Sequence, residues 1–154
     1  MDLWQAYAAS ASVAILSEGP MPDRLDRLVY RSTATRPTDV LVSLAELLGE
    51  SQRNNARSGL TGALAVHKGS FLQVIEGEPG QLDILQRRLA DDPRHRDIEV
   101  LDRRPVEARV FDGWTMASAT ISPGLAPELD ALMSEARPSG QRVVGLMLEA
   151  VERA

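Results

Sequence analysis

The sequence predicts an α+β domain of ferredoxin-like order, βαββαββ, with a five-stranded mixed sheet, two helices on one face and further helices at the C-terminus. Three observations predict it. Residues 69–77 are mostly apolar on both alternating faces and closed by glycine at each end, which is typical of an interior strand. Two helical stripes alternate with strand-like runs in the split-βαβ order. The 154 residues are enough for one domain with a sizeable core.

The N-terminal part divides into an extension and a first strand. Residues 1–24 are interpreted as an N-terminal extension, with a weak helical pattern over 3–16 that a Gly/Pro-rich stretch ends. Residues 27–32 then alternate as a strand does, so Leu28 and Tyr30 share one face. The core domain is expected to begin with this strand.

The first core helix is expected from about Asp39 to about Asn55. Thr38 is its predicted N-cap, and Gly59 is a suitable stop. Its apolar residues follow the three-four spacing of one buried face. They are Val40, Leu41, Leu44, Leu47 and Leu48. Continuing by fours gives Ser51 and Asn55, so two polar residues extend the buried face or else form a frayed, solvated last turn.

A β-hairpin and a second helix follow. Residues 60–67 and 69–77 are strand-like, and Lys68-Gly69 marks a two-residue turn between them. The second helix is expected over about residues 81–90 and ends before Asp92-Pro93. Its buried side carries Leu82, Leu85 and Leu89.

Two strands and two helices complete the prediction. A fourth strand begins with residues 98–101, and residues 111–117 lead into a fifth on which Trp114 and Met116 share one face. The C-terminal part then holds two helical stripes separated by a Pro-Ser-Gly break. They are Leu125, Leu129, Leu132, Met133 and Ala136, followed by Val143, Val144, Met147, Leu148 and Val151. The second stripe is expected to pack on the open face of the sheet or to hold a partner.

Composition excludes several classes of function. The hydrophobic share of 44% and the charged share of 25% are ordinary for a globular protein, and the net charge of −5 argues against general nucleic-acid binding. The absence of cysteine excludes disulfides and thiolate chemistry, and two histidines are too few for a histidine-rich metal site. No apolar run is long enough to cross a membrane and no secretory signal is evident, so a cytoplasmic protein is expected.

A polar cluster is predicted inside this core. In the split-βαβ topology the first and third strands are central neighbours, so Tyr30 and Gln73 stand side by side on the helix-covered face, with Asn55 and Ser51 near them. An unpaired buried amide costs roughly 1–3 kcal/mol, so Gln73 needs polar partners. The cluster suits the amide edge of a planar heterocycle, and a satisfied core network explains the same residues equally well. No good general base, catalytic triad or phosphate loop is evident.

Five segments resemble the BLUF family, the blue-light sensors that use FAD. They are LVYRS (28–32), SQRNNARSGLTG (51–62), FLQVIEG (71–77), DPRH (92–95) and FDGWTM (111–116). They occur in the family's order and at natural spacing, over about residues 26–120. The resemblance sets the flavin-binding domain at 25–121 and leaves 122–154 as a C-terminal helical extension.

The resemblance implies FAD bound noncovalently between the two core helices, with FMN as the alternative. Tyr30 then matches the photoactive tyrosine, Gln73 the switching glutamine, and Asn55 the asparagine that hydrogen-bonds the flavin edge. Trp114 and Met116 match the pair near the glutamine whose exchange of position is debated, and they complete the photoactive set. The further flavin-binding positions are Leu47 and Leu89 against the ring, Ser51 and Asn54 near it, and Arg57, Arg94 and His95 toward the ribityl-phosphate end. No catalytic residue or metal ligand is implied.

The resemblance also implies a mechanism. An excited flavin is a strong oxidant, and Tyr30 is the nearby phenol able to reduce it. Electron and then proton transfer through Gln73 lets the amide rotate or tautomerise, and the pair returns to the ground state with new hydrogen bonds to the flavin carbonyl. A small red shift that reverts in the dark marks the signalling state. The signal is expected to leave through Trp114, Met116 and the fifth strand to the C-terminal helices.

These features favour a light-driven switch without enzymatic activity, since the residues after the core leave no room for a cyclase or phosphodiesterase. Output then passes through a homodimer, a higher oligomer or a downstream protein, with no nucleic acid and no membrane involved. Two alternatives stay open: a flavin-dependent enzyme on the same fold, and a cofactor-free ferredoxin-like interaction module. An absorption spectrum separates the three hypotheses.

Overall fold

The computed structural model describes residues 24–35, 41–119 and 121–152. The expected extension at 1–24, except for its last residue, and the expected helix start at residues 38–40 lie outside these ranges. The helices and strands in chain order are β1 (Leu25–Ala34), α3 (Leu41–Ser58), β2 (Thr61–His67), β3 (Ser70–Gly77), α4 (Pro79–Asp91), β4 (His95–Val106), β5 (Ala117–Ser118), α5 (Ala126–Ser134) and α6 (Gly140–Glu152). Among the described residues, every helix is too short or too polar to span a bilayer.

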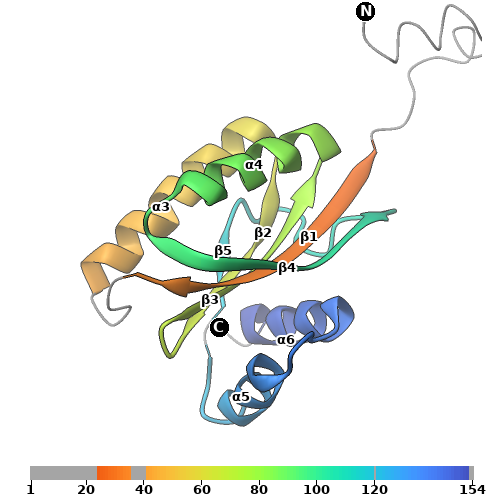
Figure 1. The fold of residues 1–154 in the computed structure, drawn as a ribbon. Helices are drawn as coiled ribbons and strands as arrows, with labels where there is room; N and C mark the ends of the chain where they lie inside the picture. The colour runs from red at the N-terminus through yellow and green to blue at the C-terminus, as the bar shows by residue number, and fades with distance from the viewer. Residues whose placement is uncertain (1–23, 36–40, 120, 153–154) are drawn as a thin grey trace, which may run out of the picture.

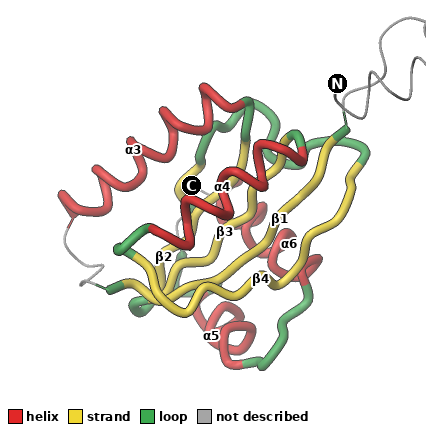
Figure 2. The backbone as a smooth tube through the Cα atoms, turned by 45° about the horizontal axis from the view of Figure 1, so that its top comes forward, coloured by secondary structure: helices red, strands yellow, loops and turns green. Residues whose placement is uncertain are grey.

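The sheet is covered on both faces. Helices α3 and α4 lie on one face, and α5 and α6 lie on the other (Figure 1). The strand order is β4-β1-β3-β2-β5, and all pairs are antiparallel except the parallel pair of β2 with β5. The predicted ferredoxin-like fold with its mixed five-stranded sheet is therefore confirmed. The tube in Figure 2 shows α3 and α4 running beside each other over the strands.

The hairpin of β2 and β3 forms the middle of the sheet. Lys68 and Gly69 have φ values of 49° and 80°, the left-handed pair that a two-residue hairpin turn requires. Every residue of β3 from Phe71 to Gly77 is buried. The reason is that β1 and β2 flank this strand and helices cover both of its faces, so the prediction of an interior strand is confirmed.

Side-chain alternation along the strands gives each face its own apolar core. The core beneath α3 and α4 contains Leu28, Tyr30, Leu47, Phe71, Ile75, Leu82 and Leu89. The core beneath α5 and α6 contains Val29, Leu72, Val74, Phe111, Leu129, Leu132, Val143, Met147 and Val151. The C-terminal helices thus pack on the second face of the sheet, which was the first of their two expected placements.

Both core helices extend further than their stripes indicated. Helix α3 continues past Asn55 to Ser58 and stops at Gly59, whose φ of 66° suits a helix C-terminus. The backbone amide of Leu60 then donates a hydrogen bond to the backbone carbonyl of Asn55 at 2.9 Å. Helix α4 begins at Pro79, before residue 81, because the fixed φ of proline suits the first turn of a helix.

The last two strands depart most from expectation. Strand β4 covers far more than residues 98–101, because backbone pairing with β1 continues along mostly charged sequence. A charged edge strand of this kind resists pairing with other chains. Strand β5 holds only Ala117–Ser118, so Trp114 and Met116 precede it. The expected shared strand face is therefore wrong, because the chain turns at Gly113, with φ of 87°, just before these two residues.

Candidate functional site

A cavity of about 460 Å³ lies between α3 and α4, above the middle of the sheet. Small-molecule sites typically measure about 300–1,000 Å³. Its floor is formed by Tyr30, Leu64 and Gln73 from three neighbouring strands. The walls include Leu47, Glu50, Ser51, Asn54, Asn55 and Ser58 from α3, Gln81, Ile84, Leu85, Arg88 and Leu89 from α4, and Asp92, Pro93, Arg94 and His95 from the corner between α4 and β4.

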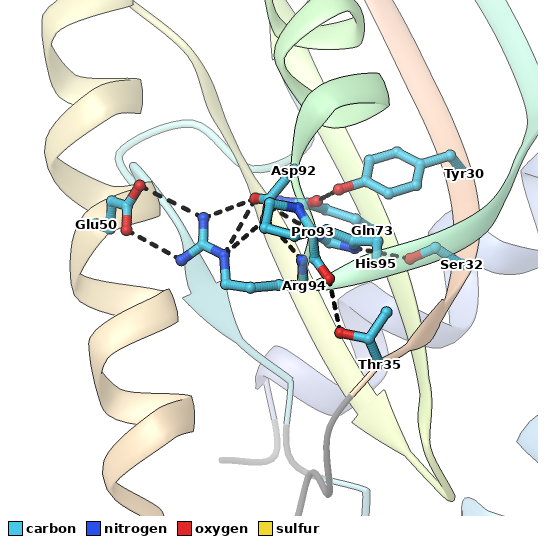
Figure 3. A network of polar contacts seen from close by, with 9 residues as sticks. All are labelled: Tyr30, Ser32, Thr35, Glu50, Gln73, Asp92, Pro93, Arg94 and His95. Atoms are coloured by element: carbon cyan, nitrogen blue, oxygen red, sulfur yellow. Dashed lines mark hydrogen bonds and ion pairs between the residues drawn. The ribbon is translucent and has the colours of Figure 1, made fainter.

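Tyr30 and Gln73 meet at the floor of this cavity. They are direct partners in the β1–β3 ladder, which places their side chains on one face. The Tyr30 hydroxyl donates a hydrogen bond to Oε1 of Gln73 (Figure 3). Burial, with a smaller contribution from the charge of Asp92, raises the pKa of Tyr30 far above its usual value. The phenol therefore stays protonated and acts as the donor.

The nitrogen of the Gln73 amide has a much weaker partner. Nε2 donates to the thioether Sδ of Met116 at 3.4 Å, and Met116 is only 3% exposed. A thioether is a poor acceptor, so it holds the amide less firmly than a carbonyl would. Among the described residues these two contacts are the hydrogen bonds of the Gln73 side chain, which leaves one N–H for a group in the cavity.

The last turns of α3 hold the segment that carries Met116. Nδ2 of Asn55 donates to the carbonyl of Thr115 at 2.7 Å, and Nε2 of Gln52 donates to the carbonyl of Met116 at 3.1 Å. Asn55 is buried and lines the cavity. Because the contacts of the described residues engage only its nitrogen, the amide oxygen of Asn55 stays free to meet a ligand.

An ion-pair network connects the two walls of the cavity (Figure 3). Nη2 of Arg94 lies 2.7 Å from Asp92, and Nη1 lies 3.0 Å from Glu50 on α3. Burial alone would raise the pKa of Asp92, but the hydrogen bonds and charge of Arg94 outweigh it and lower that pKa. Arg94 is thereby held as a fixed cation beside the cavity.

His95 is a buried imidazole next to this network. Its Nδ1 lies 2.9 Å from Oγ of Ser32, its ring centroid lies 4.8 Å from that of Phe71, and its side chain is 5% exposed. Burial lowers the pKa of His95; Asp92 opposes this shift and Arg94 adds to it. The imidazole is therefore neutral near pH 7, and it forms one hydrogen bond with the hydroxyl of Ser32.

Stability is expected to fall as the pH drops below the ordinary histidine value of 6.5. Because folding lowers the pKa of His95, the unfolded chain binds more protons than the folded chain in this range. The free energy of unfolding therefore rises with pH and reaches its full value above pH 6.5. Urea unfolding at about pH 8 and about pH 5.5 measures the effect, which His95→Gln should reduce. An unchanged pH dependence in that variant would contradict the assignment to His95.

The cavity gathers nine of the expected flavin-binding positions. They are Tyr30, Leu47, Ser51, Asn54, Asn55, Gln73, Leu89, Arg94 and His95. Three expected site residues, Arg57, Trp114 and Met116, lie outside its lining, although Met116 contacts the lining residue Gln73. Arg57 contacts Asn54 on the exposed side of α3. Trp114 is 39% exposed and reaches the sheet through its backbone carbonyl, which accepts from the amide of Gly62 at 2.9 Å.

Sequence reasoning missed several residues of the lining. Leu64 stands opposite Gln73 in the β2–β3 ladder, so the hairpin register carried a usable signal. Ile84 and Arg88 follow each other by one helical turn on α4, beside the leucine stripe that was recognised. Glu50 carried no such signal, because its place at the site depends on the ion pair with Arg94 across the two walls.

This arrangement fits a planar heterocycle with an imide edge. Leucines from both helices form apolar walls on either side of the cavity, as the faces of a flat ring require. The free N–H of Gln73 at the floor and the free oxygen of Asn55 on the α3 wall offer one donor and one acceptor, which match alternating acceptors and donors on a ring edge. The side chains present therefore fit the isoalloxazine ring that the sequence resemblance implies.

Comparison with known proteins agrees with this geometry. A family model described as sensors of blue-light using FAD (BLUF) matches residues 25–117. The chain is 37% identical over 97 residues to the photoactivated adenylate cyclase subunit beta of Euglena gracilis, covering 62% of this chain and 11% of that protein. It is 33% identical over 112 residues to a beta-like cyclase subunit of the same organism, covering 71% and 13%. The chain thus spans only a small part of the curated relatives it matches.

Solved structures show the same likeness. The dark state of BlrB, a BLUF protein, aligns with a TM-score of 0.71 and 31% identity over 84% of this chain and 98% of that one. A bacterial light-regulated adenylyl cyclase aligns with a TM-score of 0.67 and 26% identity, over 82% of this chain and 40% of that one. The family match, the shared fold and the cavity between the helices together show that this chain belongs to the BLUF family of flavin-binding blue-light sensors.

Proposed function

We propose that this chain is a blue-light photoreceptor that binds FAD noncovalently between α3 and α4, with Tyr30 and Gln73 as its switch. One observation carries the proposal: the Tyr30 hydroxyl donates to the Gln73 amide oxygen at the floor of a cavity of suitable size. FAD rather than FMN is proposed because the family description names it.

The chain's own residues would hold the cofactor in a defined way. Leu47 and Leu89 would contact the two faces of the ring, and Asn55 and Gln73 would hydrogen-bond its polar edge. Arg94 lies nearby as a cation for an anionic or carbonyl group. The bound cofactor would supply a chromophore for blue light that, once excited, is an oxidant strong enough to take an electron from a nearby phenol.

Loss of an electron makes the Tyr30 hydroxyl strongly acidic, and its proton already points at Oε1 of Gln73. Transfer of that proton to Oε1, balanced by release of one Nε2 proton to the bound cofactor, would leave the amide in its imidic acid form. This form can rotate because its nitrogen is held only by the Met116 thioether. When the electron and the proton return to Tyr30, the amide keeps a changed orientation. The donors that Gln73 presents to the cavity are then different, which accounts for a reversible red shift.

The change at the Gln73 amide also affects the segment that leads into β5. When the amide turns, Gln73 loses its contact with the thioether of Met116. Gln52 holds the backbone of Met116, and the segment that contains Met116 leads directly into β5. The proposed output passes from this segment, with Trp114 on its outer side, to α5 and α6 and then to a second copy of the chain or another protein. No chemical turnover is required, so we propose a sensor rather than an enzyme, with 25–121 as the flavin domain and 122–154 as its helical extension.

The lit-minus-dark absorption spectrum of purified protein tests the proposal. A yellow protein with a red shift that reverts in the dark supports it, whereas a colourless protein supports a cofactor-free module. Flavin bleaching with a reductant and steady turnover would support a flavin enzyme. Chromatography of the flavin released on denaturation distinguishes FAD from FMN.

Replacing Gln73 by leucine is expected to leave flavin bound and to remove the red shift. Leucine keeps the volume of the side chain but has no group that accepts from Tyr30 or donates to the ring edge. The matched control is Gln81→Leu, because Gln81 lines the same cavity but lies in the first turn of α4, away from Tyr30 and Gln73. The control is expected to keep the red shift. A full red shift in the Gln73 variant would show that the amide is not the switch.

A further inference from the structure

The side chain that follows Tyr30 in the sequence points to the other face of the sheet. Nη1 of Arg31 donates to the carbonyl oxygens of Met133 at 3.3 Å and Glu135 at 3.0 Å. Nη2 donates to the carbonyl oxygen of Ala136 at 2.9 Å. These carbonyls belong to the last turn of α5 and to the connection that leads to α6. The strand of the switch tyrosine therefore holds the end of α5 through one guanidinium.

Glu99 of β4 ties this guanidinium to the sheet. Its Oε2 accepts from Nε of Arg31 at 3.0 Å and from Nη2 at 2.9 Å, and the arginine side chain is only 16% exposed. A planar fork engaged on several sides follows a displacement of its own backbone, whereas a free side chain would absorb the displacement by rotating. A cation at a helix C-terminus also stabilises the last turn.

A second tie joins α5 to the hairpin that carries Gln73. Asp130 accepts from Nζ of Lys68 at 2.9 Å and lies 2.8 Å from Nε2 of His67. His67 and Lys68 lead directly into β3. Helix α5 is thus fastened both to the strand of Tyr30 and to the hairpin of Gln73, at two different places along its length.

Strand β1 is irregular at the point where the tyrosine and arginine lie. Its pairing register with β4 shifts between Val29 and Tyr30, and shifts again between Arg31 and Thr33. Such irregularities interrupt the ladder and let a strand bend locally. Pairing with β3 is continuous through both residues, so the irregularity lies on the β4 side. Because Tyr30 and Arg31 share one peptide unit, a displacement of one moves the other.

We propose that Arg31 is the positioning residue that transmits the light-induced change at Tyr30 through the sheet to the connection between α5 and α6, residues 135–139. The inference rests on the proposed function of Tyr30 and Gln73. When their hydrogen bonds rearrange, β1 adjusts, the guanidinium moves relative to its three carbonyls, and the last turn of α5 loosens. Asp130 keeps the earlier turns of α5 in place, so the response is concentrated after residue 132.

Hydrogen–deuterium exchange of the flavin-loaded chain, in the dark and under blue light, tests this role. The variants are Arg31→Gln and the matched control Arg142→Gln, since Arg142 also reaches Glu135 but does so from α6. In the parent, light is expected to speed exchange in peptides covering residues 131–140. In R31Q these amides exchange about fivefold faster already in the dark, because the helix end has lost its cation. Light then adds no further change in R31Q, while R142Q keeps the parent's response.

The lit-minus-dark spectrum of the same samples keeps this inference separate from the proposed function. A parent-sized red shift in R31Q without an exchange response at 131–140 supports the inference, because the switch works and this response, unlike a change carried through Met116 and β5, is lost with Arg31. An R31Q protein with the parent's exchange response overturns it, as does a parent with a full red shift and no response at 131–140. A parent without a red shift overturns the proposed function, and this inference with it. If R31Q does not bind flavin, Arg31→Lys, which keeps the charge but not the fork, is measured with the same outcomes.

Discussion

Replacing Tyr30 by phenylalanine is expected to abolish the light-induced red shift while the protein stays yellow. Phenylalanine keeps the ring that fills the core beneath α3 and α4 but lacks the hydroxyl that donates to Gln73. It gives up an electron far less readily and has no proton to pass to the amide. The lit-minus-dark difference spectrum measures the effect, with bound flavin quantified on the same sample.

The control for this substitution is Trp114→Phe. Trp114 is exposed and lies outside the cavity lining, so a full red shift is expected in that variant. A full red shift in Tyr30→Phe would instead show that another residue supplies the electron. The Tyr30 variant also leaves the buried Gln73 oxygen without its donor, which costs about 1–3 kcal/mol. A lower melting temperature is therefore expected and is not by itself a sign of lost photochemistry.

Truncating Glu76 to alanine is expected to lower the free energy of unfolding by about 3–5 kcal/mol. The carboxylate is fully buried and pairs with Arg27 at 3.0 Å. It also accepts from the backbone amides of Val110 at 2.9 Å and Phe111 at 2.8 Å. Alanine would leave a guanidinium and two amides without their acceptor. The loss is large compared with the total stability of a domain, about 5–15 kcal/mol, and urea denaturation measures it.

Glu135→Ala is the matched control for Glu76. Glu135 pairs with Arg142 at the surface, where an ion pair contributes about 0–1 kcal/mol. Indistinguishable unfolding curves for the two alanine variants would contradict the prediction. Glu76 lies on the same strand as Gln73 and holds the start of the connection that brings Met116 to it. Its carboxylate therefore supports the geometry of the switch as well as the stability of the fold.

Local patterns in the sequence were enough for the centre of the sheet. The two-residue turn at Lys68-Gly69 sets the register of the hairpin, and the alternation of β3 then decides which face Gln73 occupies. The split-βαβ order makes β1 the other neighbour of β3, so Tyr30 meets Gln73. These features depend on turn residues and strand periodicity, both of which are determined by short segments of the sequence.

The same reasoning predicts less well the edge strand β4 and the segment that carries Trp114 and Met116. The sequence places the start of β4 at Ile98 and not at His95, because the charged residues before Ile98 lack the apolar alternation that marks a strand, although β1 pairs with them. Trp114 was placed beside Met116, whereas the turn at Gly113 exposes the tryptophan and buries the methionine. In both cases backbone pairing or a turn in three dimensions outweighs the side-chain pattern.

The sequence by itself determined the order of the elements, the central strand pair and the amide and phenol that face the cavity, because periodicity and turn residues act over a few positions along the chain. Only the tertiary structure decided which distant groups meet: Glu50 with Arg94, Glu76 with the amides of Val110 and Phe111, and Arg31 with the end of α5. Hydrogen bonds and ion pairs of this kind join residues far apart in the chain. Their partners depend on how the layers pack, which no local pattern encodes.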